Sequence, residues 1–125
     1  MLIHYLLFEA FKGLAKTEPI AAVATAVSLL SMAGIPLTAG FVAKFSIFAQ
    51  AMNGAAFLVL IAVIGSALSI AYYLRLIISM FFHKESSFKT SEKMSITYNI
   101  VAIFIIVAIL ALGIYPDLFK MQFGL

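Results

Sequence analysis

The amino-acid sequence predicts an all-α membrane protein with three transmembrane passes, the first of which is a discontinuous (broken) helix. Hydrophobic residues occupy 65% of the 125 positions, against about 45–50% in soluble domains, and the mean hydropathy is +1.17. Charged residues account for 10%, against roughly 25% in soluble domains. These figures exclude a soluble enzyme domain, a disordered tail and a nucleic-acid-binding protein.

The charges gather outside the long apolar runs. The formal net charge is +3, yet only Lys44 and Arg75 are charged between Pro19 and His83. Most basic residues therefore belong to connectors and orient the protein in the membrane. The chain contains no cysteine, which excludes disulfides and thiolate metal sites.

Residues 1–18 are predicted to form a surface connector that precedes the transmembrane portion, residues 19–125. The apolar stretch at its start is too short for a pass of about 20 residues, and polar residues follow it. Pro19 then predicts a helix start, because proline suits the first helical position and pushes the preceding residue out of the helical region.

The first apolar run, residues 19–52, is longer than one straight pass requires, and residues 34–40 interrupt it. Pro36 lacks an amide donor and clashes with the carbonyl of Met32, four residues earlier, while two glycines ease unusual backbone angles. We therefore expect two half-helices joined by a hinge, which is tolerated at membrane depth only inside protein or beside a water-filled cavity. The predicted hinge residues are Gly34, Pro36 and Gly40.

Asn53-Gly54 predicts a turn, and the two further passes are expected at residues 55–82 and 96–115. Small and polar residues recur every three or four positions along the second pass, which places them on one helical face. Two interpretations of this face stay open: a polar path beside the hinge, or helix packing with Arg75 reaching the membrane interface. The candidate residues are Ser69, Tyr72 and Arg75.

Orientation follows from the loop charges. The connector before Pro19 and the lysine-bearing loop 83–95 are separated by two passes, so they lie on the same side of the membrane. Because cytoplasmic loops carry the excess of Lys and Arg, loop 83–95 is predicted to be cytoplasmic.

Lys44 is the main candidate for function. It follows the hinge by about four residues and lies roughly 12 Å from the end of its pass at 1.5 Å per residue. An ionisable residue inside the membrane costs about 2.5–3.5 kcal/mol on insertion scales and usually marks a proton or ion path. The alternative is a lysine whose stem lies along the helix while its ammonium reaches the outer interface.

Other polar residues offer little further chemistry. His4 and His83 are solitary, so no metal site is predicted. The hydroxyl residues Ser28, Ser31 and Thr38 are expected to bond backbone groups freed by the hinge.

No carboxylate is expected at membrane depth, so a proton relay through Lys44 needs partners from elsewhere. The acids are Glu9, Glu18, Glu85, Glu92 and Asp117.

The hinge sequence SMAGIPLTAGFVAKF, residues 31–45, resembles subunit N of bacterial respiratory complex I, the proton-translocating NADH-quinone oxidoreductase. Residues 11–19 and the segments 65–67 and 71–75 resemble the same family. Looser forms of the hinge occur in subunits L and M and in multisubunit sodium/proton antiporters. The resemblance implies that Lys44 stands in the outer proton path, and the lysine argues against subunit M, whose pattern has glutamate there.

The resemblance covers the final three helices of a subunit that has about fourteen. It implies a C-terminal fragment that takes part in an enzyme complex and has no autonomous activity. The implied partners are the upstream helices, the other membrane-arm subunits and the lipid bilayer of a bacterial inner membrane, with no nucleic acid. No cofactor is expected on this chain, since the complex uses NADH, FMN, iron–sulfur clusters and quinone elsewhere. The alternatives are a subunit of a cation/proton antiporter and a structural helix module without transport.

Overall fold

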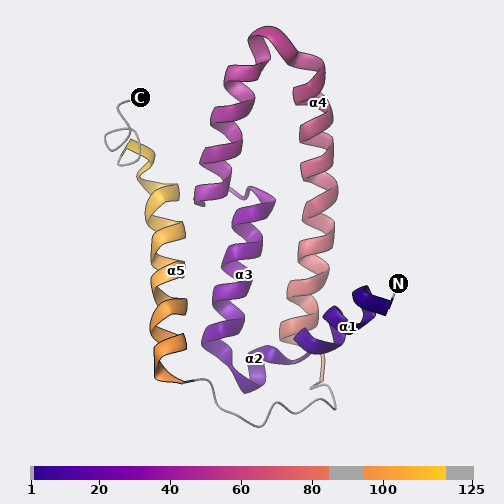
Figure 1. The fold of residues 1–125 in the computed structure, drawn as a ribbon, viewed down its shortest axis with the longest axis vertical. Helices are drawn as coiled ribbons and strands as arrows, with labels where there is room; N and C mark the ends of the chain where they lie inside the picture. The colour runs from indigo at the N-terminus through magenta and orange to yellow at the C-terminus, as the bar shows by residue number, and fades with distance from the viewer. Residues whose placement is uncertain (1, 85–94, 118–125) are drawn as a thin grey trace.

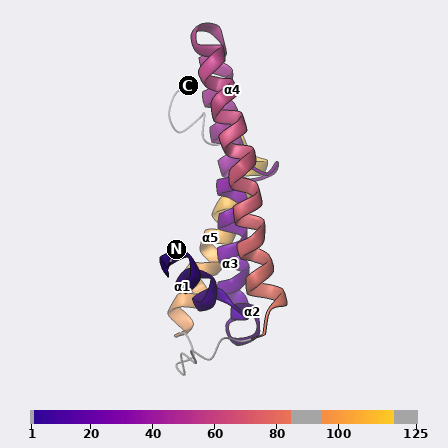
Figure 2. The same ribbon diagram turned by 90° about the vertical axis from the view of Figure 1, so that its right-hand side faces the viewer.

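The computed structural model describes residues 2–84 and 95–117, and every regular element in these two ranges is helical. The three longest helices lie side by side in a thin layer (Figure 1, Figure 2). The predicted all-α class is confirmed. The elements are α1 (Leu2–Phe11), α2 (Leu14–Thr17), α3 (Pro19–Ala33), α4 (Ala39–Phe82) and α5 (Ile96–Ile114).

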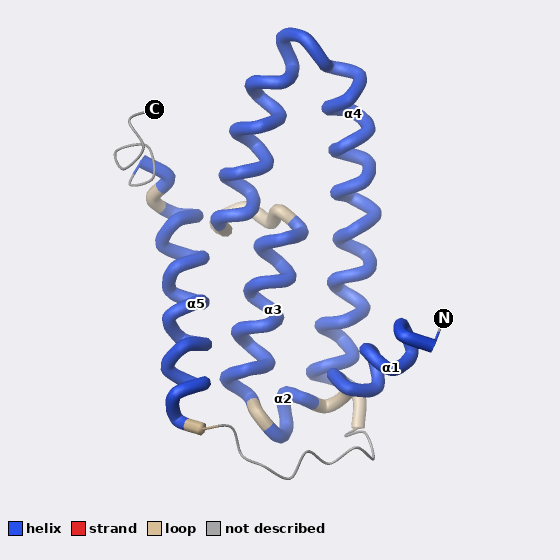
Figure 3. The backbone as a smooth tube through the Cα atoms, in the orientation of Figure 1, coloured by secondary structure: helices blue, strands red, loops and turns tan. Residues whose placement is uncertain are grey.

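α3 and the start of α4 form the discontinuous first pass. Pro19 stands in the first turn of α3, as expected from its fixed backbone angle. Residues 34–38 are not helical, and Figure 3 shows this segment as a loop between two helices. The predicted break is confirmed, but it is shorter than expected, because Gly40 already lies in the first turn of α4.

α4 consists of two arms that meet at Ala55. The backbone of Ala55 leaves the helical region, with φ −141° and ψ 39°, and the chain reverses direction at this end of the molecule (Figure 1). We call residues 39–54 the first arm and residues 56–82 the second arm. The second arm runs beside both the first arm and α3, and the reversal lies next to the turn predicted at Asn53-Gly54.

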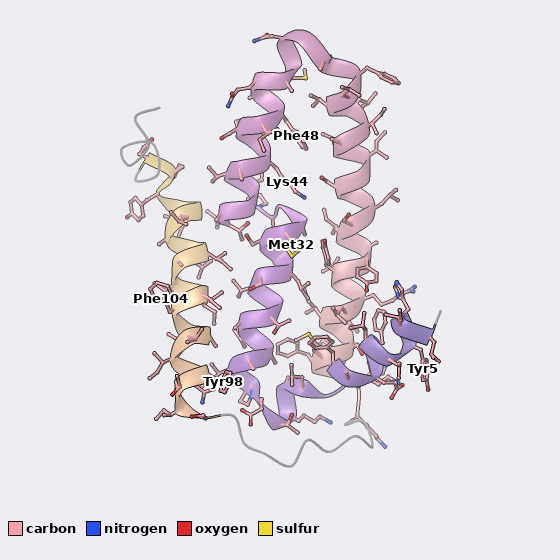
Figure 4. All side chains as sticks on the ribbon, viewed as in Figure 1. Tyr5, Met32, Lys44, Phe48, Tyr98 and Phe104 are labelled. Carbon is pink, nitrogen blue, oxygen red and sulfur yellow. The ribbon has the colours of Figure 1, made fainter. Side chains whose placement is uncertain are left out.

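The long helices have the length and composition of membrane spans. The most apolar windows of α4 and α5 have mean hydropathies of 2.4 and 2.5, and only 6% and 0% of these windows is buried within the chain. Large apolar side chains such as Phe57, Leu68 and Phe104 are more than 70% exposed, and Figure 4 shows Phe104 on the outer side of α5. Such surfaces face lipid or other helices rather than water.

The buried apolar cluster lies where α1 and α2 meet α3 and the second arm. Its centre is Ala22, Leu76 and Met80. Gly13, with φ 71°, donates its backbone N–H to the carbonyl of Ser79 at 3.3 Å. Partly buried residues surround the cluster: Phe8, Phe11, Leu14, Ala15, Leu29 and Phe81. This packing fixes the connector against the second arm.

The predicted cytoplasmic loop 83–95 lies outside the described residues except at positions 83, 84 and 95. Its lysines at 89 and 93, together with the acids at 85 and 92, therefore have no structural account. The division of the chain at residue 18 and the orientation of the loops stay predictions.

Candidate functional site

α3 ends because the chain turns away at Gly34, whose φ of 85° and ψ of 40° are left-handed. The N–H of Gly34 bonds the carbonyl of Ser31 at 3.0 Å, and the N–H of Ile35 bonds that of Leu30 at 3.2 Å. This is a Schellman-type helix ending, in which a glycine relieves the steric cost of the left-handed backbone. The carbonyls of Met32 and Ala33, the last two residues of α3, receive no bond from this motif.

Lys44 supplies the missing donors. Met32 would normally bond the N–H of residue 36, but Pro36 has none. The Nζ of Lys44 instead donates to the carbonyl oxygens of Met32 at 2.8 Å and Ala33 at 3.4 Å. The negative end of the α3 dipole also favours a cation at this position. In Figure 4 Lys44 lies just beyond Met32, across the hinge.

The second arm contributes a further acceptor to the same ammonium group. Nζ of Lys44 donates to Oγ of Ser66 at 3.3 Å. All three acceptors are uncharged oxygens within the membrane-spanning part of the chain. The ammonium therefore points back to the hinge rather than along the first arm toward the reversal at Ala55.

Ser31 and Thr38 form hydrogen bonds to backbone groups at the hinge, as predicted for these two of the three hydroxyl residues. Oγ of Ser31 accepts the N–H of Gly40 at 3.0 Å, and Oγ1 of Thr38 donates to the carbonyl of Ile35 at 2.6 Å. The expectation for Ser28 is wrong, because its hydroxyl bonds the carbonyl of Ala24 within α3 at 2.8 Å.

Gly40 serves close packing rather than backbone freedom, which corrects the predicted role. A Cβ at Gly40 would lie 1.8 Å from the carbonyl oxygen of Ser31, so any side chain would force the two half-helices apart. The left-handed residue on this side of the hinge is instead Leu37, with φ 75°. Pro36 is exposed beside it.

α5 closes against the hinge at a second glycine. A Cβ at Gly113 would lie 2.2 Å from the carbonyl oxygen of Leu37. The backbone of α5 therefore touches the hinge directly. Gly113 was not predicted as part of the site, since a lone glycine in an apolar helix does not reveal which backbone approaches it.

The predicted face of the second arm does not converge on the hinge. Oγ of Ser69 bonds the carbonyl of Gly65 within its own helix at 2.9 Å. The ring of Tyr72 packs against His4 and Phe8 of α1, with centroids 5.2 and 6.1 Å apart. Arg75 lines a pocket beside α1. Tyr72 and Arg75 thus lie at the α1 end of the second arm, apart from Lys44.

The serine of the second arm that meets the hinge lysine is Ser66, whereas Ser69 was the predicted candidate. Lys44 stands eleven residues before Ala55, where the two arms meet, and Ser66 stands eleven residues after it. Two antiparallel arms pair positions that are equally distant from their turn. The turn predicted at Asn53-Gly54 would have placed Val63 opposite Lys44, so the pairing with Ser66 depends on the reversal at Ala55, which the structure shows.

The fold and the site define an integral membrane protein with a discontinuous helix, in which a lysine binds the backbone carbonyls at the break. The family model described as NADH:quinone oxidoreductase/Mrp antiporter, TM, matches residues 4–69, more than half of the chain. The chain belongs to this family.

Curated relatives sharpen the assignment. NADH-quinone oxidoreductase subunit N of Cytophaga hutchinsonii is 40% identical over 118 residues, which are 94% of this chain and 25% of the relative. F(420)H(2) dehydrogenase subunit N of Methanosarcina mazei is 38% identical over 114 residues, 89% of this chain and 23% of the relative. The resemblance to subunit N is confirmed, and the chain spans about a quarter of the length of these relatives.

Proposed function

We propose that this chain is the C-terminal part of a proton-translocating membrane-arm subunit of an NADH-quinone oxidoreductase, with Lys44 as its proton-handling residue. The observation that carries the proposal is the ammonium group of Lys44, which bonds the carbonyls of Met32 and Ala33 at the hinge. A positive charge held beside a helix break inside an apolar pass is typical of a transport site.

The surroundings of Lys44 suit a group that gains and loses a proton without moving far. Backbone carbonyls and the hydroxyl of Ser66 accept hydrogen bonds from the ammonium but do not take its proton. A neutral lysine amine retains two N–H donors, so it can keep two of these bonds after releasing a proton. The proton therefore passes to water at the hinge or to groups outside the described residues.

The remainder of the proposal rests on the resemblance to subunit N. The upstream helices of the subunit and the other membrane-arm subunits are the proposed partners, in the inner membrane of a bacterium with loop 83–95 on the cytoplasmic side. NADH, FMN, iron–sulfur clusters and quinone are bound elsewhere in the complex, which couples quinone reduction to the proton path. This chain alone is proposed to have no enzymatic activity.

Substitution of Lys44 tests the proposal in membranes that contain the assembled complex. Lys44→Met should reduce proton translocation driven by quinone reduction by about tenfold, because it removes the titratable amine from the path. Lys16→Met is the matched control, since it removes a lysine from the connector and should leave pumping unchanged. Proton uptake into inverted vesicles, measured beside quinone reduction, separates pumping from electron transfer. Normal uptake and normal quinone reduction in Lys44→Met would refute the role of Lys44.

A cation/proton antiporter subunit is the second candidate, because the matching family model names Mrp antiporters as well as the quinone oxidoreductases. The genes that flank the coding sequence separate the two: redox subunits support the first function and antiporter subunits the second. A structural module is the third candidate. It predicts that Lys44→Met is silent while substitutions at Gly65 and Ser69 prevent assembly.

A further inference from the structure

A pocket of about 710 Å³ lies between α1 and the second arm of α4, away from the hinge. α1 contributes His4 and Tyr5 to its wall, and the second arm contributes Leu74, Arg75, Ile78 and Ser79. Figure 1 shows α1 crossing one end of the second arm, and the lining residues place the pocket there. Arg75 is seven residues from the end of α4, which corresponds to roughly 10 Å along the helix.

Arg75 and Ser79 each bring to this pocket a polar group without a partner in the described part of the chain. The guanidinium of Arg75 forms no hydrogen bond or ion pair with the residues that the structure describes. The hydroxyl of Ser79 is buried, with the residue 3% exposed, and has no hydrogen-bond partner among the same residues. A buried hydroxyl without a partner costs about 1–3 kcal/mol. Both groups therefore indicate that an acceptor from outside belongs in the pocket.

The charge of the pocket indicates an anion. Lys12 also lines the pocket, but its ammonium already bonds the carboxylate of Glu9. Arg75 is thus the cation left available, and a guanidinium binds a phosphate oxygen pair through parallel N–H donors. A serine hydroxyl can donate one more bond to a third oxygen.

We propose that this pocket binds the phosphate headgroup of an anionic glycerophospholipid, with Arg75 as the main ligand and Ser79 as a supporting donor. The apolar wall favours a lipid over a soluble anion. Leu74 and Ile78 stand beside Arg75 and are 43% and 49% exposed, so they offer an apolar surface along the second arm to an acyl chain. α1 exposes Leu2, Ile3 and Tyr5 at the same end, as an interfacial helix does.

Lipid binding to the full chain, delipidated in a neutral detergent, tests the proposal. Phosphatidylglycerol should bind and phosphatidylcholine should not. Arg75→Gln should weaken phosphatidylglycerol binding about thirtyfold, because it removes both the charge and the paired donors. Lys16→Gln is the charge-matched control on the connector and should weaken binding about fivefold or less. Arg75→Lys should fall between the two, since it keeps the charge and loses the planar pair of donors.

Ser79→Ala keeps the test decisive if Arg75→Gln reduces helicity in circular dichroism. The Ser79→Ala variant should fold normally. Its affinity for phosphatidylglycerol should fall about threefold to tenfold, because the hydrogen bond from the serine hydroxyl to the phosphate is lost. Glycerol 3-phosphate and inorganic phosphate distinguish a lipid from a free anion: neither should displace phosphatidylglycerol at millimolar concentration. The proposal is overturned if either compound displaces phosphatidylglycerol. It is also overturned if Arg75→Gln binds phosphatidylglycerol as tightly as the wild type, or if Lys16→Gln and Arg75→Gln lose the same affinity.

Discussion

The hinge and the α1 end of the second arm treat their polar groups in opposite ways. At the hinge, Lys44 has three acceptors within the chain. At the α1 end, Arg75 and the hydroxyl of Ser79 have no partner among the described residues. Because an unsatisfied polar group in an apolar environment is costly, the difference separates a cation whose hydrogen bonds are made within the described residues from polar groups that have none there.

The same contrast holds for glycines. Gly40 and Gly113 each lie so close to a backbone carbonyl that a Cβ would collide with it, whereas a Cβ at Gly65 would have no neighbour within 4 Å in the described chain. The helix-packing interpretation of the second-pass face is therefore not met at Gly65 within these residues. The hinge is tightly packed, and the face of the second arm at Gly65 is open.

Gly40→Ala should have the largest effect on stability. The added methyl group would lie 1.8 Å from the carbonyl oxygen of Ser31, so the half-helices must separate and the bond from the N–H of Gly40 to Ser31 is lost. We expect the free energy of unfolding to fall by about 3 kcal/mol. Unfolding by sodium dodecyl sulfate in mixed micelles measures this change.

Gly65→Ala is the matched control, because it makes the same chemical change in open space. Alanine has the higher helix propensity, so this variant should be neutral or more stable by up to about 1 kcal/mol. Equal destabilisation by the two variants would show that the hinge is no more tightly packed than the open face, and the contrast would fail.

Ser66→Ala should lower the free energy of unfolding less than Gly40→Ala does, through the loss of a hydrogen bond from Lys44. It removes one of three acceptors, and the loss of such a hydrogen bond costs about 0.5–1.5 kcal/mol. Ser69→Ala, one helical turn further along, removes only a bond to its own helix and should change the free energy of unfolding by less than about 0.5 kcal/mol. The same unfolding titration compares them, and an effect of Ser69→Ala that matches Ser66→Ala would contradict the assignment of Ser66 to the site.

The hinge could be predicted from sequence because its causes are local. Pro36 lacks a donor wherever it stands, and Gly34 two residues earlier permits a left-handed ending, so the break required no knowledge of the neighbouring helices. The face of the second arm was different. Periodicity placed Ser69, Tyr72 and Arg75 on one side of a helix, but it does not reveal which element each residue meets.

Tertiary geometry decided those contacts. α1 packs against Tyr72 and lines a pocket together with Arg75, so one helical face passes from open surface to the α1 pocket along its length. Gly113 depends on the approach of α5 to Leu37, which no local pattern encodes. Ser66 also depends on tertiary geometry, because the reversal at Ala55, rather than at the predicted Asn53-Gly54, sets the register of the two antiparallel arms.

The pair of Lys12 and Glu9 gives the smallest expected effect on the comparison between the hinge and the α1 pocket. Unlike Arg75, Lys12 has a partner for its charge in that pocket. The hydrogen bond from Lys12 to the Glu9 carboxylate raises the pKa of Lys12 above its usual 10.5. A raised pKa in the folded state means that the pair stabilises the fold below pH 10.5, and that this contribution disappears as the pH rises through the raised value. Because Lys12 lies at the surface, the change in stability should be too small to detect. Glu9→Gln should lower the pKa of Lys12, followed through the nuclear magnetic resonance signal of its ε-carbon. An unchanged pKa in Glu9→Gln would mean that solvent, rather than Glu9, satisfies this ammonium, and Lys12 would then join Arg75 as a cation available to an outside anion.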